Sequence, residues 1–360
     1  MSLNEEDEEY IAESRDPTPE PCFDISSNNS TPNRHASQQN QRTKDNERVP
    51  DMQLGKCRYV RLHDNVNYVA SALVLRGEGD ATDILLIQEA KKKCYGKWYV
   101  PAGRVEPGES IEHAVHREMY EETGFRCEVV ELLSMQVQGS GWYRFAFIVN
   151  VTAGTIKTKP DEESLCAQWF PVKDVMAKKV ELRGTDFLRL VDEALAYRTA
   201  VHCPEVPKLM PVNVNMAGMF VEFMIYRYNF NASKVDVLVH RSVQDEESLS
   251  THDQPFPTCE FGFEYFFAMV VSRCYKHLLE EGANVVFAPS SVTRIRCLPS
   301  PEESPAHGLA VRVACEHKKS ASKAAVRSPS RYHWISVENV ETRRRLRIDK
   351  DQYRPSLHLL

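Results

Sequence analysis

The sequence lacks any apolar run that approaches the length needed to span a bilayer, and no basic segment followed by an apolar one stands at its beginning. Its ten cysteines are scattered without a single C-x-x-C pair, which excludes the common zinc pattern and a compact disulfide framework. These absences predict a protein that does not attach to membranes and that works in a reducing compartment, the cytoplasm or the nucleus.

The sequence also lacks a basic stripe. Its first fifty residues hold eleven acidic residues and five Lys or Arg, which leaves 40 of each kind from the chain totals of 51 and 45. Residues 1–52 are rich in Ser, Asn, Gln and Pro and poor in large apolar side chains, so we expect a disordered acidic tail. Binding of a polynucleotide through release of counterions is therefore not expected.

What the sequence does contain is a dense acidic motif at residues 103–125, GRVEPGESIEHAVHREMYEETGF. Ser110 can cap a helix that Gly124, suited to a left-handed C-terminal cap, would end. One apolar stripe recurs at steps of three and four residues and predicts the face of this helix that packs on a core: Ile111, Ala114, Val115 and Met119.

Three carboxylates share a neighbouring face of the predicted helix, because residues three and four apart lie side by side: Glu118, Glu121 and Glu122. They repel one another unless a divalent cation lies between them. Hard oxygen ligands favour Mg²⁺ or Mn²⁺, which keep several waters and bridge to phosphates. The alternative is an exposed helix in which charged side chains pair with one another in solvent.

The motif fills every fixed position of G-x5-E-x7-R-E-U-x-E-E-x-G-U, where U is aliphatic or aromatic, and so resembles the box of the Nudix hydrolases. The resemblance implies a metal-dependent hydrolase of phosphoric anhydride bonds. Glu118 and Glu122 would be direct metal ligands, and Glu121 a ligand or the base that deprotonates the attacking water. The Gly103 carbonyl would complete the metal shell. The same likeness has Arg117 pair with Glu109 to orient the loop against the helix.

The resemblance covers residues 56–200 and implies an α/β fold, the Nudix α/β/α sandwich with a mixed sheet. Thr185 would cap a last helix that runs from Asp186 to about Tyr197. The strands predicted around the box are 68–75, 84–87, 97–100, 128–137, 142–151 and 167–172.

A linker at 201–212 precedes a second, non-catalytic α+β domain at 213–348, and residues 349–360 form a C-terminal tail. The elements expected there repeat the order found in the first domain, which predicts a degenerate Nudix-like repeat. Lys276 and His277 stand where the box has Arg117 and Glu118, so this copy would hold no metal in the same way. An unrelated α+β domain is the alternative. The expected elements are strands 214–226, 235–240, 285–287, 293–297, 309–315 and 332–335, with a helix at 261–279.

Three segments narrow the substrate by resemblance: LLIQEAKKKCYGKWYVPAGRVEPGES, GSGWYRFAFIV and ESLCAQWFP. They are similar to the animal Nudix enzymes that hydrolyse 8-oxoguanine nucleoside diphosphates, 8-oxo-dGDP and 8-oxo-GDP, to the monophosphates and phosphate. This implies removal of oxidised nucleotides from the pool. One alternative is a Nudix pyrophosphatase for ADP-ribose or a nucleotide sugar. Another is a nucleotide-binding or scaffold protein without turnover.

Candidate substrate residues flank the box, and each has a structural alternative. Arg104 could clamp a phosphate or form a surface salt bridge. Trp142 and Trp169 could stack on a purine or belong to the core. Asp186 could accept hydrogen bonds from a guanine edge or simply favour the first turn of a helix. Glu163, beside Glu162, could lie at the substrate as a further base or belong to an ordinary acidic loop.

Overall fold

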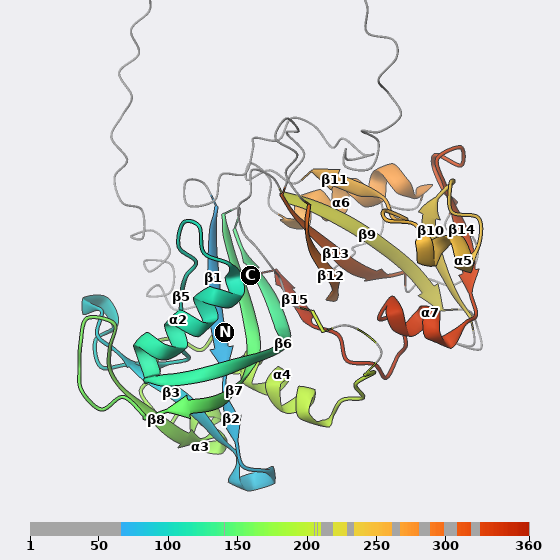
Figure 1. Ribbon diagram of the computed structural model, residues 1–360. Helices are drawn as coiled ribbons and strands as arrows, with labels where there is room; N and C mark the ends of the chain where they lie inside the picture. The colour runs from blue at the N-terminus through green and yellow to red at the C-terminus, as the bar shows by residue number, and fades with distance from the viewer. Residues whose placement is uncertain are drawn as a thin grey trace, which may run out of the picture. The chain divides into compact units, whose positions relative to one another are not determined.

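The computed structural model of the chain describes residues 66–139, 141–204, 206, 208–209, 219–228, 234–260, 267–280, 289–298, 308–317 and 325–359. Figure 1 shows their helices and strands. All of them belong to one compact unit, Asp45–Leu360. The predicted acidic tail at 1–52 lies outside the described residues. Among the described helices, none is long and apolar enough to cross a membrane.

The first half of the described chain is built on a mixed sheet. Strand β1 (Asn67–Leu73) lies parallel to β7 (Trp142–Gly154) and antiparallel to β5 (Ala102–Arg104), and β7 is antiparallel to β6 (Phe125–Gln138). A smaller antiparallel sheet contains β2 (Leu75–Arg76), β3 (Asp83–Glu89), β4 (Trp98–Tyr99) and β8 (Ser164–Pro171). The 3₁₀ turns η1 and η2 cover Gly79–Ala81 and Lys92–Cys94.

Two cores lie on opposite faces of this β layer. Helix α2 (Ile111–Thr123) buries its apolar stripe against one face, together with Ala70 and Phe145. The helices α3 (Val172–Met176) and α4 (Leu188–Thr199) cover the other face, where Leu190 packs near Ala146. Alternate side chains of a strand point to opposite faces, so long strands such as β1 and β7 contribute to both cores. The predicted α/β/α sandwich with a mixed sheet is confirmed.

Two local predictions for this half were wrong. The expected strand 68–75 divides at Val74, and only Leu75 and Arg76 pair with β3, because β1 takes β5 and β7 as its partners. Thr185 does not cap the last helix. The N-cap is Phe187, which has no side-chain hydrogen bond, and the Leu188 amide donates to the Thr185 carbonyl instead.

The second half repeats the strand pairing of the first. Strand β9 (Met219–Tyr228) is parallel to β13 (Gly308–Glu316) and antiparallel to β11 (Thr258–Glu260), and β13 is antiparallel to β12 (Ser291–Leu298). In the same way, β1 is parallel to β7 and antiparallel to β5, and β7 is antiparallel to β6. The antiparallel pair β10 (Val235–His240) and β14 (Tyr332–Val337) corresponds to β3 and β8.

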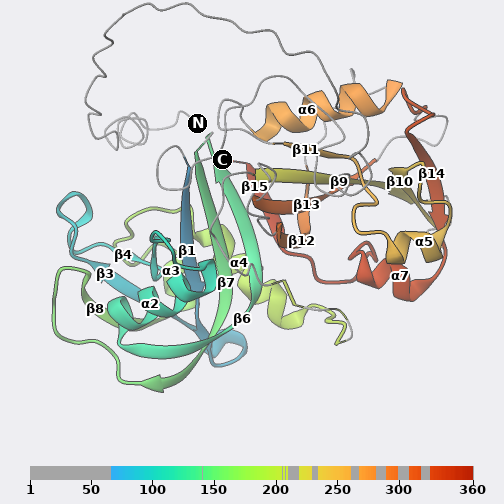
Figure 2. The same ribbon diagram turned by 45° about the horizontal axis from the view of Figure 1, so that its top comes forward.

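The helices repeat as well. Helix α6 (Phe267–Leu278) packs on one face of β9 and β13 through residues such as Val271 and Tyr275, as α2 packs on β1 and β7 (Figure 2). Helix α7 (Val340–Arg345) follows β14 as α3 follows β8. The short α5 (Glu246–Thr251) lies between β10 and β11, where the first half has the 3₁₀ turn η2. The topology supports the predicted repeat. Helix α6 carries no acidic residue, and the expected strand 285–287 lies outside the described residues.

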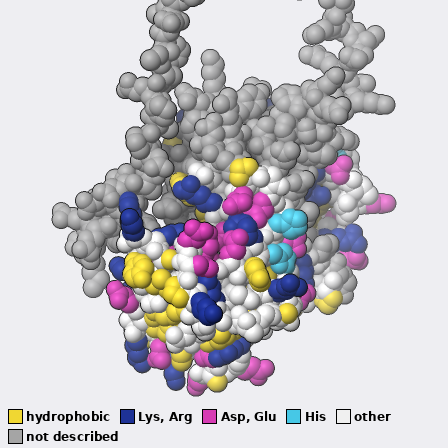
Figure 3. All heavy atoms as spheres, turned by 60° about the vertical axis from the view of Figure 1, so that its left-hand side comes forward, with side chains coloured by type: hydrophobic (Ala, Val, Ile, Leu, Met, Phe, Trp, Pro, Cys, Tyr) yellow, Lys and Arg dark blue, Asp and Glu magenta, His cyan; other side chains and the backbone are white. Residues whose placement is uncertain are grey.

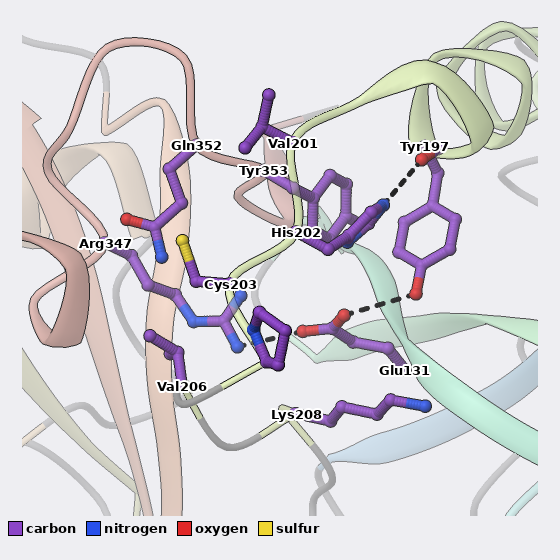
Figure 4. Close-up of a pocket in the computed structure, with 11 residues that line it drawn as sticks. Glu131, Tyr197, Val201, His202, Cys203, Val206, Lys208, Arg347, Gln352 and Tyr353 are labelled. Atoms are coloured by element: carbon purple, nitrogen blue, oxygen red, sulfur yellow. Dashed lines mark hydrogen bonds and ion pairs between the residues drawn. The ribbon is translucent and has the colours of Figure 1, made fainter.

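The last residues, expected as a tail, form the strand β15 (Ser356–Leu359). It lies parallel to β6 and antiparallel to β12, so that the mixed sheet of the first half and the strands of the second half form one 11-stranded sheet. A cavity of about 140 Å³ lies where this C-terminal segment meets the end of α4 and the predicted linker. Figure 4 shows Glu131 between Tyr197 and Arg347 at this cavity.

Candidate metal and substrate site

The box forms a helix with defined ends. The Ser110 hydroxyl accepts a hydrogen bond from the His113 amide at 3.0 Å, which satisfies one of the free donors at the helix start. Gly124 ends α2 in the left-handed conformation with φ 77°, and its amide donates to the Tyr120 carbonyl. A Cβ at Gly124 would lie 2.4 Å from the Thr155 carbonyl oxygen, so glycine is needed there for space and for backbone conformation.

Arg117 holds the loop and the helix of the box together. Its Nε and Nη2 donate to the two carboxylate oxygens of Glu109 at 2.9 and 3.0 Å, and Nη2 also donates to the Arg104 carbonyl at 2.9 Å. Its Nη1 donates to Glu118 at 2.6 Å and to Glu121 at 3.1 Å. A planar guanidinium can satisfy several acceptors at once, so one residue orients both segments. Figure 3 shows acidic side chains gathered around basic ones on the side that carries α2 in Figure 1.

Two of the box carboxylates are deeply buried. Glu118 is 6% exposed and Glu122 is 1% exposed, whereas the Glu121 side chain is 38% exposed. Burial raises the pKa of Glu118 in spite of the nearby Arg117. Burial, followed by the charge of Glu118, raises the pKa of Glu122 well above its ordinary value. A cation beside these carboxylates would oppose both effects and favour their ionised forms.

The residues at this site fit a divalent cation. A Cβ at Gly103 would lie only 1.8 Å from Glu118 Oε1, so the absence of a side chain lets the backbone approach the carboxylate closely. Ala102 donates its amide to Glu122 Oε2 at 2.9 Å and fixes that side chain against the same loop. Among the residues that the structure describes, no three acidic, His or Cys side chains are already arranged to hold a metal ion. Arg117 donates hydrogen bonds to the carboxylates of Glu118 and Glu121 in this arrangement.

Gly103→Ala is expected to weaken Mg²⁺ or Mn²⁺ binding and to reduce activity roughly 10- to 100-fold, as changes that disturb a metal ligand's orientation do. The added methyl group would displace the Glu118 carboxylate from its place against the loop. Metal titration of hydrolysis measures the effect, and Ala102→Gly, which alters the adjacent residue without adding atoms, is the control. An unchanged metal requirement in Gly103→Ala would contradict the assignment.

A buried carboxylate that was not predicted from the sequence, Glu89, lies at the end of β3. It is 1% exposed and pairs with Arg183, whose Nη1 lies 2.5 Å from Glu89 Oε1. The charge of Glu89 also contributes to the raised pKa of Glu122, after burial and Glu118. A glutamate two residues after the apolar run Ile84–Ile87, within the same strand, was the available signal for Glu89, because a buried charge needs a partner.

A polar group lies on the face of the β layer opposite α2. Asp186 Oδ2 accepts hydrogen bonds from Tyr99 Oη at 2.6 Å and from Arg144 Nη1 at 2.5 Å. Burial alone would raise the pKa of Asp186, but Arg144 and Tyr99 outweigh it and the net shift is downward. Asp186 is therefore an ionised acceptor whose Oδ2 is engaged by the protein.

Arg104 and Trp142 come together beside this group. The Arg104 guanidinium lies 4.8 Å from the centre of the Trp142 ring, and both Arg104 and Arg144 are register partners of Val69 on neighbouring strands. Trp169 lies elsewhere, on β8, with the Arg76 guanidinium 4.3 Å from its ring centre. The structure thus groups Arg104, Trp142 and Asp186 and separates Trp169 from them.

The loop that carries Glu162 and Glu163 is tied to the end of the box helix. Lys157 Nζ donates to the Glu121 carbonyl at 2.7 Å, and Ser164 Oγ donates to the Glu122 carbonyl at 2.8 Å. Within the loop, the Glu163 amide donates to Asp161 at 2.9 Å. Glu162 is exposed and Glu163 is half-buried in this loop beside the end of the box helix.

Comparisons with known proteins identify the family. The NUDIX domain model matches residues 67–191. A Caenorhabditis elegans protein described as "Putative nudix hydrolase 1" is 62% identical over 357 residues, 98% of each chain. The chain belongs to the Nudix hydrolase family and is therefore a hydrolase of pyrophosphate bonds.

Other relatives match a smaller part of the chain. The 8-oxo-dGDP phosphatase NUDT18 of Homo sapiens is 43% identical over 158 residues, which is 43% of this chain and 47% of that protein. The chain thus matches about half the length of this relative. A solved NUDIX hydrolase from Nitrosomonas europaea covers 37% of this chain and 90% of its own, with 28% identity and a TM-score of 0.32.

Proposed function

We propose that the chain hydrolyses 8-oxoguanine nucleoside diphosphates to the monophosphate and inorganic phosphate. The observation that carries the proposal is the combination of the acidic box with the polar group of Tyr99, Arg144 and Asp186 on one β layer. The 43% identity over 158 residues to a relative named 8-oxo-dGDP phosphatase supports the choice of substrate.

In the proposed site, Glu118, Glu122, Glu121 and the Gly103 carbonyl would hold Mg²⁺ or Mn²⁺. The bound ion would supply charge neutralisation of the phosphate oxygens. Arg117 fixes the positions of Glu118 and Glu121 before the ion enters, and must give up part of this contact when it does. Glu109 then retains Arg117 through its two hydrogen bonds, so the guanidinium stays in place.

Water is the nucleophile in this proposal. A carboxylate takes one proton from the water while the water oxygen forms a bond to phosphorus. The bond from phosphorus to the bridging oxygen breaks. The freed oxygen stays on the other product. Glu121 is the candidate base because it is the most exposed of the three carboxylates on α2. Glu163 is a second candidate, in a loop tied to the end of the same helix.

The guanine base of the substrate would lie against the face of the sheet that is opposite α2. Asp186 is an ionised acceptor and can take hydrogen bonds from the N1–H and amino group of a guanine edge through Oδ1, while Oδ2 stays with Tyr99 and Arg144. Trp142 offers a ring for stacking and Arg104 a guanidinium for a phosphate.

A substrate panel tests the proposal. We expect kcat/KM for 8-oxo-dGDP to exceed that for dGDP, ADP-ribose and a nucleotide sugar with Mg²⁺ or Mn²⁺ present. Loss of one hydrogen-bond partner for a base edge typically costs about 1–3 kcal/mol, roughly 10- to 100-fold, so Asp186→Asn should narrow the preference for 8-oxo-dGDP over ADP-ribose by about that factor. Asp174→Asn, the same chemical change at a residue that pairs with the exposed Lys179, is the control. A higher kcat/KM for ADP-ribose than for 8-oxo-dGDP would reject the proposed substrate.

A further inference from the structure

A row of polar side chains crosses four strands in the second half. The register partners, in order across β11, β9, β13 and β12, are Thr258, Glu222, Arg312 and Arg294. Alternation along β9 and β13 places this row away from α6, because the intervening residues Val221, Phe223, Val311 and Val313 pack in the core that α6 shares.

The same row exists in the first half. Across the corresponding strands β5, β1, β7 and β6 its members are Arg104, Val69, Arg144 and Gln136. Both rows have an arginine at the centre, followed by apolar and alanine positions, in Arg144-Phe145-Ala146 and Arg312-Val313-Ala314. The second row therefore occupies the place of the candidate substrate face of the first half.

The second row and the neighbouring Arg296 together hold three arginines and one carboxylate, Glu222. Glu222 is 1% exposed and accepts from Arg296 Nη2 and Arg312 Nε, each at 2.7 Å. One buried carboxylate thus serves two guanidiniums, and Arg294 adds a third. The negative charge of the exposed Asp253 opposes the lowering of the Arg294 pKa.

Several buried donors in this cluster have no hydrogen-bond partner among the described residues. They are Arg296 Nε, Arg312 Nη2 and Thr293 Oγ1. The Arg312 side chain is only 8% exposed, and its guanidinium lies 4.6 Å from the centre of the Phe256 ring. Leaving a buried charged donor unpaired is costly, and native proteins retain such groups where something else completes them.

The surroundings of Arg294 indicate that a ligand at this cluster would carry negative charge. Its pKa is lowered, first by burial and then by the charges of Arg312 and Arg296. Arg294 is half-buried and has no hydrogen bond within the described residues, so its fork is open to a ligand. An anion at this point would offset the three guanidiniums and accept from the unpaired donors.

We propose that Arg294, Arg296 and Arg312 form an anion site in the second half, which binds the phosphate group of a small phosphorylated molecule. Guanidinium forks match the oxygens of a phosphate in geometry and charge. The cluster lies on a sheet whose helix α6 has no acidic residue, so the site binds without metal and without hydrolysis. This proposal does not depend on which substrate the first half hydrolyses.

The test uses the full-length protein in EDTA, where the box holds no divalent cation, and isothermal titration with inorganic pyrophosphate. We expect saturable binding that Arg294→Gln weakens at least about tenfold, since one charge-assisted contact is lost. Arg294 makes no hydrogen bond to Glu222, so this variant should fold, and thermal unfolding confirms it. Arg345→Gln, an exposed arginine on α7, is the matched control and should bind like the wild type.

Further titrations separate the possible ligands. Tighter binding of GMP than of pyrophosphate supports a nucleotide, and equal or weaker binding supports a free phosphate ion as the occupant. Citrate binding as tight as that of pyrophosphate would overturn the phosphate assignment. The proposal is also overturned if the wild type binds none of these anions, or if Arg294→Gln binds pyrophosphate as tightly as Arg345→Gln does. An Arg104→Gln variant, altered only in the first half, should retain the binding.

Discussion

Glu122→Gln is expected to lower kcat about 10³-fold while leaving the metal-free protein as stable as the wild type or more so. Glu122 is 1% exposed, and its pKa is raised by burial and by Glu118. An amide has nearly the same shape as the carboxyl group and can still accept from the Ala102 amide. The variant therefore removes a metal ligand and its charge without removing the packing.

The direction of the expected change in stability follows from the raised pKa of Glu122. A carboxyl group whose pKa is raised in the folded protein costs stability above its unfolded pKa, because the unfolded chain ionises more easily. In EDTA at neutral pH, Glu122→Gln should therefore unfold at the same or a higher temperature than the wild type. Below pH about 4.5, the ordinary value for glutamate, the difference should vanish. With Mg²⁺ or Mn²⁺ only the wild type should be stabilised, because binding to the folded state alone raises stability.

Glu112→Gln is the matched control, since Glu112 lies on the same helix, is partly exposed and contacts only His116 at 4.0 Å. It removes one carboxylate from α2 as Glu122→Gln does, and should leave kcat and the metal response unchanged. Steady-state hydrolysis and thermal unfolding with and without metal measure both variants. If Glu122→Gln retained activity close to that of the wild type, the assignment of the metal site would be wrong.

The box was predictable because its structure is determined locally. Ser110, the apolar stripe and Gly124 lie within one helical segment, and each acts on neighbours a few residues away. The order of strands around the box fixed the fold class in the same way. The repeat was visible for a related reason, because β10, β12, β13 and β14 are short alternating runs with clear ends.

Contacts between distant segments could not be predicted. Glu89 is 94 residues from Arg183, and nothing in the sequence near either residue indicates the pair. Asp186 was expected at a first helical turn, but its partner Tyr99 lies 87 residues away on β4. Thr185 has the composition of a cap, yet Phe187 takes that place because its side chain is buried in the core under α4. Tertiary burial outweighs a local capping preference in this case.

Another contact between distant segments joins the C-terminal segment to the first half. Arg347 Nη2 lies 2.9 Å from Glu131 Oε1, and each side chain is 5% exposed (Figure 4). Glu131 also accepts from the Leu209 amide and from Tyr197 Oη. Six residues after Arg347, Tyr353 donates its hydroxyl to the carbonyls of β6, and β15 then pairs with that strand.

Arg347→Ala is expected to lower the free energy of unfolding by about 3–5 kcal/mol, the usual cost of leaving one member of a buried ion pair without its partner. The carboxylate of Glu131 would remain buried without its opposite charge, and β15 would lose the contact that precedes it in the chain. Urea unfolding measures the change. Arg345→Ala is the control, because Arg345 and Glu341 form an exposed pair four residues apart, and such pairs contribute about 0–1 kcal/mol.

Glu131→Gln combined with Arg347→Met separates charge from packing. Removing both charges avoids an unpaired buried ion, so the double variant should be more stable than Arg347→Ala by about 1–4 kcal/mol. If Arg347→Ala and Arg345→Ala destabilised the protein equally, Arg347 would not hold the C-terminal segment to β6. If the double variant were as unstable as Arg347→Ala, the unpaired charge of Glu131 would not be the cause of the instability. The expected order therefore tests how much this buried ion pair adds to the contacts that hold the C-terminal strand on the sheet that carries the box.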